Sequence, residues 1–209
     1  MDELVQQAMA KWPHVPACYG WLGLDARGQW RMRDDAVQAL GTFNSGAPGA
    51  QGSVLRHDKL IGFIQRNYAA DARGCWYFQN GPQRVFVELA AAPWIWRVNQ
   101  RGQLAAFEPS FNPEPVFVPT HPETPNVEKN KVEGQVPFPV LSVWVDESGW
   151  LYANTPAGLG LVHSQDVGVA VEMIESGAWP APQALLRAGI EQIFGFVLSP
   201  AALTERGSV

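Results

Sequence analysis

The sequence predicts an α+β protein in which an antiparallel, hairpin-built sheet packs against about three helices. A four-residue turn pattern recurs between short apolar runs, as hairpins require, and separate segments carry apolar residues at helical spacing. The chain has 209 residues, of which 46% are hydrophobic, so it can form one core without disulfides. We therefore expect a single domain over residues 1–209.

The recurring turn consists of Asp or Asn followed three residues later by Gly. Asp25–Gly28 (Asp-Ala-Arg-Gly) returns as Asp71–Gly74, with looser copies at 99–102 and 146–149. The first side chain can accept hydrogen bonds from the backbone, and Gly accepts the left-handed conformation that closes a type I turn with a bulge. Because the flanking residues do not align, we interpret these copies as recurring turn chemistry and not as a true repeat.

These turns, with a further turn at 80–83, divide the apolar runs into four hairpins and about eight strands. The copy at 71–74 is the exception, because it follows a predicted helix and leads into a strand. The expected strand pairs are 19–24 with 29–33, 75–78 with 84–89, 94–98 with 103–107, and 140–145 with 150–153.

Three segments have the apolar spacing of amphipathic helices. They are residues 2–12, 58–70 and 165–176. Ser164 is expected to cap the start of the third helix, and Gly177 to end it. A further helical piece is expected at 182–193, and then a final strand at 194–198 before a frayed end.

Residues 109–139 stand apart because they hold eight of the seventeen prolines. Proline cannot donate to a strand ladder, so this stretch should be an extended excursion from the domain. It could serve as a partner-binding arm or be a tolerated insertion.

Charge and composition exclude several classes of protein. Lys and Arg number 15 against 20 Asp and Glu, a net charge of -5, which argues against a nucleic-acid binder. The start of the chain lacks the features of a secretory signal, and no stretch has the length of a membrane span, so we expect a cytoplasmic protein without membrane contact. In that compartment we expect Cys18 and Cys75 to be free thiols, and a single disulfide between them is the alternative.

The glycine-rich stretch 41–53 is the one place where the sequence offers a small-molecule site. Its glycines, including Gly49 and Gly52, could let the backbone cradle a phosphate, and Arg56 and His57 flank the following helix start. The phosphate-loop ending and the dinucleotide-binding glycine spacing are both missing. The alternatives are an enzyme or sensor for an anionic, phosphorylated ligand and a mobile surface loop.

No coherent catalytic or metal-binding set emerges from the remaining residues. His14 and Cys18 are four residues apart, but no further ligands follow at zinc-like spacing. His163, Ser164 and Asp166 are too close in sequence to face one another as a nucleophile, base and orienting acid must. We expect no catalytic residue, no metal and no cofactor, and whether the protein is an enzyme stays open, with a non-enzymatic role favoured.

Nine tryptophans are the most unusual feature of the composition. Trp94 and Trp96 alternate on one predicted strand and so share a face. Both could lie in the core, or they could leave an aromatic surface exposed for a protein partner. The favoured hypothesis is a binding or accessory protein that uses this aromatic sheet surface. A homodimer joined edge to edge through a hairpin is a further alternative.

Six runs of the sequence carry a resemblance when they are taken together. They are Lys11–Pro13, Cys18–Leu22, Asp25–Trp30, Phe63–Tyr68, Phe78–Val85 and Gly160–Asp166. Together they resemble an uncharacterised family of proteobacterial proteins, a domain of unknown function. The resemblance covers about residues 1–107 and 140–200 and implies a bacterial cytoplasmic protein, with no activity, ligand or catalytic residue attached to it.

Overall fold

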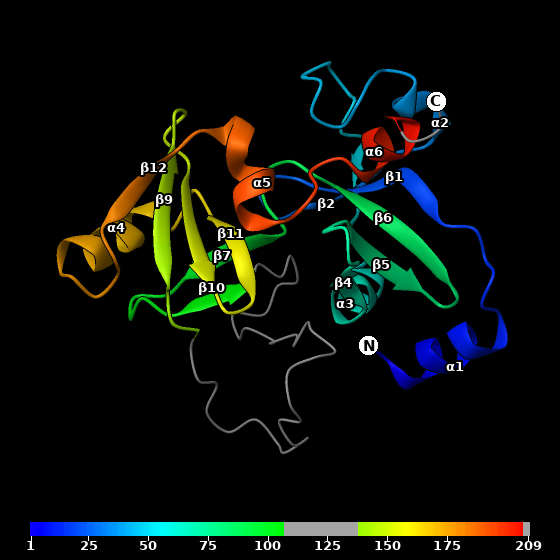
Figure 1. The fold of residues 1–209 in the computed structure, drawn as a ribbon, viewed down its shortest axis with the longest axis horizontal. Helices are drawn as coiled ribbons and strands as arrows, with labels where there is room; N and C mark the ends of the chain where they lie inside the picture. Colours follow the sequence, from blue (N-terminus) through cyan, green and yellow to red (C-terminus); the bar gives the residue numbers. More distant parts are fainter. Residues whose placement is uncertain (107–137, 207–209) are drawn as a thin grey trace.

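The computed structural model describes residues 1–106 and 138–206 of the chain and confirms an α+β protein. Two six-stranded sheets lie side by side, with helices around them (Figure 1). The first sheet has the strand order β3-β2-β1-β6-β5-β4, and the second has the order β12-β9-β10-β11-β7-β8. The proline-rich stretch 109–139 falls almost entirely outside the described residues.

The first sheet uses the N-terminal part of the chain and the second sheet uses the rest. The first comprises β1 (Cys18–Leu24), β2 (Trp30–Met32), β3 (Ser53–Val54), β4 (Tyr68–Ala70), β5 (Trp76–Asn80) and β6 (Gln83–Leu89). The second comprises β7 (Trp94–Val98), β8 (Leu104–Ala106), β9 (Ser142–Asp146), β10 (Leu151–Thr155), β11 (Gly158–Val162) and β12 (Pro182–Leu185).

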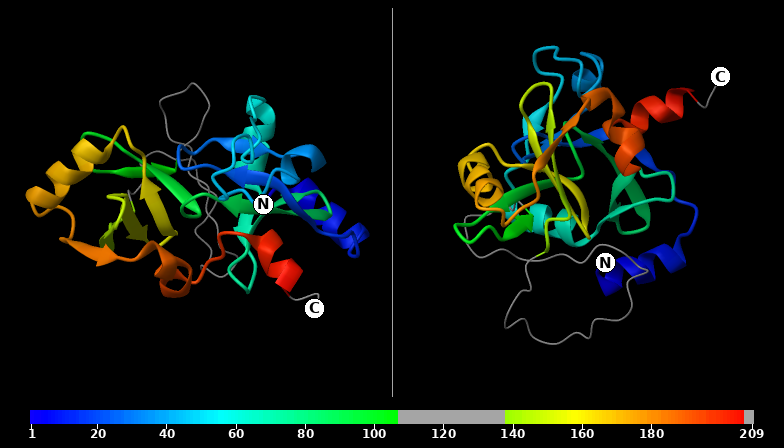
Figure 2. Two further views of the ribbon diagram at one scale, coloured as in Figure 1. Left: turned by 90° about the horizontal axis from the view of Figure 1, so that it is seen from above. Right: turned by 60° about the vertical axis from the view of Figure 1, so that its left-hand side comes forward.

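Helices flank both sheets. Figure 2 shows from two further sides the helices that lie around each sheet. α1, α2, α3 and α6 lie around the first sheet, and α4 and α5 lie around the second. Their bounds are α1 (Glu3–Lys11), α2 (Asp35–Gln38), α3 (Asp58–Arg66), α4 (Val167–Glu175), α5 (Ile190–Phe194) and α6 (Pro200–Arg206), with a 3₁₀ turn at Arg187–Gly189.

The two sheets repeat one five-stranded unit. The unit in the first sheet consists of β1, β2, β4, β5 and β6, and the unit in the second sheet consists of β7, β8, β9, β10 and β11. When the strands of each unit are numbered one to five along the chain, they lie in the sheet in the order 2-1-5-4-3 in both cases. In each set the first and fifth strands are parallel, and the other neighbours are antiparallel. β3 and β12 are additional edge strands, one for each sheet.

The register of the two units also agrees residue by residue. Corresponding positions lie 74 residues apart in the first hairpin and 75 apart in the last three strands. The turns at 25–28 and 99–102 occupy equivalent places in this structural duplication, and so do the turns at 71–74 and 146–149. The interpretation that the copies do not belong to a repeat is corrected to that extent, while the turns at 25–28 and 71–74 belong to different hairpins of one unit. Equivalent pairs are Leu24–Trp30 with Val98–Leu104, Leu22–Val87 with Trp96–Val162, and Ala70–Trp76 with Val145–Leu151.

The four recurring turns have the predicted chemistry. In each, the Oδ1 atom of Asp25, Asp71, Asn99 or Asp146 accepts hydrogen bonds from the backbone N–H groups two and four residues later. The closing glycine has φ between 72° and 78° in all four. The turn at 71–74, expected to follow a helix, instead joins β4 to β5, because α3 ends at Arg66.

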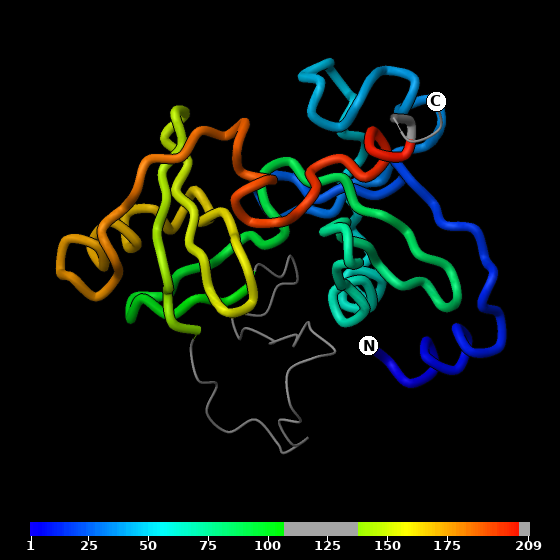
Figure 3. Tube along the Cα trace, viewed as in Figure 1, coloured from blue at the N-terminus to red at the C-terminus, as the bar shows by residue number. Residues whose placement is uncertain are grey.

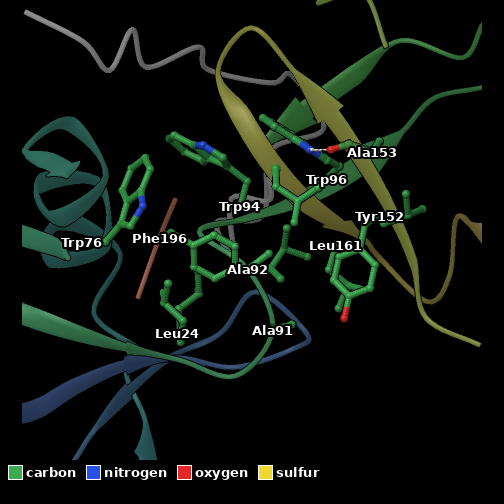
Figure 4. Packing of buried hydrophobic residues seen from close by; sticks show 14 of the residues in the cluster. Leu24, Trp76, Ala91, Ala92, Trp94, Trp96, Tyr152, Ala153, Leu161 and Phe196 are labelled. Atoms are coloured by element: carbon green, nitrogen blue, oxygen red, sulfur yellow. Dashed lines mark hydrogen bonds between the residues drawn. The ribbon is translucent and has the colours of Figure 1, made fainter. Parts of the chain in front are cut away.

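An aromatic row joins the two sheets through the core (Figure 4). Ring centroids lie 4.7 Å apart for Tyr68 and Trp76, 5.4 Å for Trp76 and Trp94, and 5.6 Å for Trp94 and Trp96. The linker Ala90–Pro93 is buried beside this row, and the Tyr68 hydroxyl donates a hydrogen bond to the Pro93 carbonyl. One continuous cluster of buried apolar residues therefore includes members of both sheets.

The four predicted hairpins and the three predicted helices are present, with differences in the sheet and near the C-terminus. The strands form two mixed sheets and not an antiparallel one, because β1·β6, β7·β11 and β9·β12 are parallel pairs. Residues 182–185 form β12 in place of a helix start, since Pro180 and Pro182 favour extended backbone. The final strand is reduced to a bridge between Cys75 and Val197, and α6 follows in place of a frayed end.

Candidate functional site

The glycine-rich stretch is closed around a buried arginine. The Arg33 guanidinium donates hydrogen bonds to the carbonyl oxygens of Ala50 (2.6 Å), Gly41 (2.5 Å) and Gly20 (3.2 Å). Burial lowers the pKa of Arg33, while the nearby carboxylate of Glu88 acts in the opposite direction. Carbonyl groups of this loop thus surround a cation of the protein itself, whereas a phosphate cradle needs free N–H groups.

The same loop is fixed to the first sheet at two further points. The Phe43 side chain is 1% exposed and packs against Gly23 of β1, and the Asn44 amide donates to the carbonyl of Leu89 (2.8 Å). The alternative of a mobile surface loop is therefore not supported by these contacts.

The four residues predicted to bind an anion have other surroundings. Gly49 and Gly52 have positive φ values of 82° and 75°, and the Gly52 N–H donates to the Gly49 carbonyl. The Nδ1 atom of His57 accepts the N–H of Leu60 and so caps the start of α3, while the Arg56 side chain is exposed. These residues form turns and a helix cap, and no described contact joins them in a site.

Trp94 and Trp96 share a face, as predicted, but that face is in the core. Their exposed fractions are 8% and 1%, and the indole N–H groups donate to the carbonyls of Ala157 (2.9 Å) and Ala153 (3.0 Å). Figure 4 shows the second of these bonds. Because both indoles are buried and satisfied, the assignment of these two residues to a partner-binding surface is corrected to a core position.

The segment that contains His163, Ser164 and Asp166 starts α4 and ties it to the second sheet. The Asp166 carboxylate pairs with the Arg97 guanidinium and accepts the Val98 N–H (3.0 Å). Burial acts to raise the pKa of Asp166, but the bonds from Arg97 and Val98 outweigh it and lower that pKa. The residue at the N-cap position is Asp166 and not the predicted Ser164, which is exposed.

His163 belongs to the same turn and is 7% exposed. Its imidazole Nδ1 atom accepts a hydrogen bond from the backbone N–H of Gln165 (3.2 Å), and the backbone N–H of His163 donates to the carbonyl of Trp96. Burial lowers the pKa of this imidazole, and the positive charge of Arg97 lowers it further. These contacts give the three residues roles in the turn, and none of them places a nucleophile opposite a base.

Both cysteines are free, as predicted. Burial raises the pKa of the Cys75 thiol, and the carboxylate of Asp71 adds to the effect, so the thiol form is favoured over the reactive thiolate. Burial likewise raises the pKa of Cys18. Among residues 1–106 and 138–206, no three His, Cys, Asp or Glu side chains gather in a way that could hold a metal ion.

A cleft of about 650 Å³ opens between α5, α6 and the turn that joins β4 to β5. Its apolar lining includes Phe196, Val197 and Leu198 from the segment between the two helices, and Leu203 from α6. The Val197 N–H donates to the Gly74 carbonyl, and the Leu198 carbonyl accepts the Leu89 N–H. The cleft is therefore lined by an extended segment that is fixed to the first sheet.

Two side chains of opposite charge line the cleft, and both already have partners. Arg73 donates from Nε (3.0 Å) and Nη2 (2.9 Å) to the Asp71 carboxylate, and bonding to Asp71 and then to Tyr19 raises its pKa. Glu191 accepts the Leu198 N–H through Oε1 (2.6 Å). The cleft thus combines apolar surface with Arg73, which is neutralised by Asp71, and with the carboxylate of Glu191.

Sequence reasoning did not find this cleft. Its residues come from three separate stretches: Ala72–Gly74, Glu191–Gln192 and Gly195–Leu203. The last stretch was predicted to be a strand with a frayed end, so nothing in the local pattern placed it against the turn at 71–74.

The sequence profile of one protein family matches residues 1–201. The chain belongs to the family DUF2944. That family carries the description "Protein of unknown function (DUF2946)", which agrees with the resemblance to a domain of unknown function. Comparisons of this DUF2944 member with curated proteins and with solved structures gave no match. Within the described part of the chain, no helix is long and apolar enough to cross a membrane.

Proposed function

We propose that the protein is a non-enzymatic binding or accessory protein that holds an apolar segment of a protein partner in the cleft between α5 and α6. The observation that carries this proposal is the exposure of Leu203. This large apolar side chain is 40% exposed and lines a cleft of about 650 Å³. Binding sites are concave and mainly apolar, with a few polar groups that fix orientation.

The charges in the cleft favour an uncharged segment over a phosphorylated ligand. Arg73 is neutralised by Asp71, and the nearby Glu191 would repel an anion. A phosphate group needs several unpaired donors or an uncompensated cation. An apolar side chain needs only the surface that Phe196, Val197 and Leu203 provide.

A non-enzymatic role is also consistent with how the chemically capable side chains are used. The Cys75 thiol is buried with a raised pKa, and Asp166 is paired with Arg97. His163 accepts a backbone N–H within its own turn. Asp166 and His163 thus have structural partners, and the Cys75 thiol is buried in the core.

Site-specific photo-cross-linking in the host cell tests the proposal. A photoreactive phenylalanine analogue at position 203 should give one protein-sized adduct. Ala202→Arg, which places a long charged side chain in the cleft, should reduce that adduct about tenfold or more. The folded state of each variant is checked by thermal unfolding.

Leu186 provides the matched control, because it is 71% exposed and does not line the cleft. Leu186→Arg should leave the adduct at position 203 unchanged. An adduct that survives Ala202→Arg, or that forms equally well from position 186, would overturn the proposal. A small-molecule adduct of a few hundred daltons in native mass spectra, displaced by Ala202→Arg, would replace the protein partner with a small ligand.

A further inference from the structure

α1 is held against the first sheet by a small set of contacts. The backbone N–H of Asp2 donates to the Asn67 amide oxygen (2.8 Å), and the Asp2 carboxylate pairs with Arg66 (3.3 Å). Val5 is the one buried residue of the helix, and Ala8 lies against the tip of the β5–β6 hairpin, where a Cβ atom built on Gly81 would be 4.0 Å from its own Cβ. Asn67, Arg66 and Gly81 therefore form a receptor for α1.

The segment that joins α1 to β1 is extended and exposed. Every residue from Trp12 to Ala17 is exposed, and Pro13 and Pro16 restrict this segment to open backbone conformations. Figure 3 shows it as a long strap between the helix and the first sheet. The Gln83 side chain donates one hydrogen bond to the Pro16 carbonyl (3.1 Å).

This segment, Trp12–Ala17, is called the hinge below, and it carries apolar side chains that the described part of the chain leaves exposed. Trp12 is 51% exposed and Val15 is 36% exposed. Trp30, Trp76, Trp94 and Trp96 are buried, whereas Trp12 and Trp21 are the exposed tryptophans of the described residues. Within residues 1–106 and 138–206 the Lys11 ammonium lies 4.6 Å from the centroid of the Trp12 ring, and the ring is still 51% exposed, so covering the hinge would remove apolar surface from water.

We propose that two copies of the chain exchange α1 to form a dimer, so that the helix of each copy occupies the receptor of the other. The exchange keeps the Asp2–Asn67, Asp2–Arg66 and Ala8–Gly81 contacts, because the receptor is identical in both copies. The two hinges then run side by side in opposite directions. Trp12 and Val15 of each copy are covered by the hinge of its partner.

A second copy is the occupant that the structure favours. The receptor is complementary to this helix, since it binds a backbone N–H, a carboxylate and an apolar side chain in the order in which α1 presents them. The gain over the monomer is the burial of the hinge, which requires two hinges together. The proposal is independent of the cleft between α5 and α6, because no residue of α1 or the hinge lines that cleft.

Disulfide trapping between singly substituted chains tests the exchange directly. One chain carries Ala8→Cys and the other Gly81→Cys, both with Cys18→Ser and Cys75→Ala. The spacing of the two Cβ positions suits a disulfide. Mixing the chains, unfolding them together and refolding under oxidation should give a disulfide-linked heterodimer. Ala10→Cys on the same exposed helix serves as the control partner and should give none.

Light scattering on the unmodified chain provides a second measurement, because Gly81 has a positive φ and a cysteine there could prevent folding. The expected mass is that of a dimer, and Trp12→Ser should weaken the dimer about tenfold. The proposal is overturned if the unmodified chain has the mass of a monomer at every concentration. It is also overturned if a chain with both substitutions forms only an intramolecular disulfide and the mixed single variants form none.

Discussion

The aromatic ring of Phe43 lies where Gly23 would carry a side chain, so that a Cβ atom built on Gly23 would overlap the Cε2 atom of the ring. Gly23 is the second-to-last residue of β1, and Phe43 belongs to the glycine-rich loop. The absence of a side chain at one position thus allows a loop twenty residues away to pack directly on the sheet. This contact explains why a flexible composition gives a fixed loop.

Gly23→Ala should destabilise the protein, because the added methyl group overlaps the Phe43 ring. The expected loss in the free energy of unfolding is about 3 kcal/mol, at the upper end for overpacking. Urea unfolding measures it. Gly168→Ala in α4 is the matched control: no atom lies within 4 Å of its Cβ position, so the variant should gain about 0.5–1 kcal/mol. Equal effects of the two substitutions would contradict the role given to Phe43.

Arg33→Met should release the glycine-rich loop. Three carbonyl groups, of Gly20, Gly41 and Ala50, lose their donor, and a buried unsatisfied acceptor costs about 1–3 kcal/mol. We expect a loss of at least about 3 kcal/mol in urea unfolding and faster hydrogen exchange across 41–52. Arg56→Met, at an exposed arginine beyond the same loop, should change the stability by less than about 0.5 kcal/mol.

Turn chemistry made the hairpins predictable from the sequence. An Asp or Asn with a glycine three residues later acts through its own backbone neighbours, so the signal is local, and all four copies have the same hydrogen bonds. The pairing of β1 with β6 is parallel and joins residues more than sixty positions apart, and no local pattern encodes it. The structural duplication was missed for the same reason. Its halves share strand order and register, while equivalent core positions hold different residues, such as Trp76 and Leu151.

The candidate sites show the same limit more strongly. The predicted anion site grouped residues that are close in sequence, namely Gly49, Gly52, Arg56 and His57. The side chain that holds the glycine-rich loop is instead that of Arg33, the residue that follows β2. The cleft residues Arg73 and Leu203 are 130 positions apart and meet only after the chain has folded. The tryptophan count indicated large aromatic contacts correctly, but composition alone does not separate buried from exposed indoles.

Two turns at equivalent places in the two units allow the ion pair to be separated from the turn itself. Asp25 and Asn99 make the same backbone contacts, but the Asp25 carboxylate also pairs with Arg31 at 2.7 Å and is nearly buried. Asp25→Asn keeps the turn and removes the ion pair, and should cost about 1–3 kcal/mol in urea unfolding. Asn99→Asp, at an exposed site, should change the stability by about 0.5 kcal/mol or less. If Asp25→Asn left the free energy of unfolding unchanged, the ion pair with Arg31 would make no contribution to stability.

His163 should make the stability depend on pH below neutrality. Burial and then Arg97 lower its pKa below the ordinary value of 6.5, so the unfolded chain takes up a proton more readily than the folded one. The charged groups around it are Arg97 and Arg27, which lower the pKa, and Asp166 and Asp25, which oppose them. Stability is therefore complete above pH 6.5 and falls as the pH decreases from there through the folded pKa.

The structural reason is that a protonated imidazole has no acceptor at Nδ1, so the bond from the Gln165 N–H is lost. His163→Asn places an amide oxygen near the position of Nδ1 and removes the titration. Urea unfolding at pH 7.5 and pH 5.5 should show a loss of stability at the lower pH in the unsubstituted chain, and a clearly smaller one in His163→Asn. Asp166 also has a lowered pKa, but it affects stability only in the more acidic range around its ordinary value of 3.8. The same pH dependence in both proteins would assign the effect to a group other than His163.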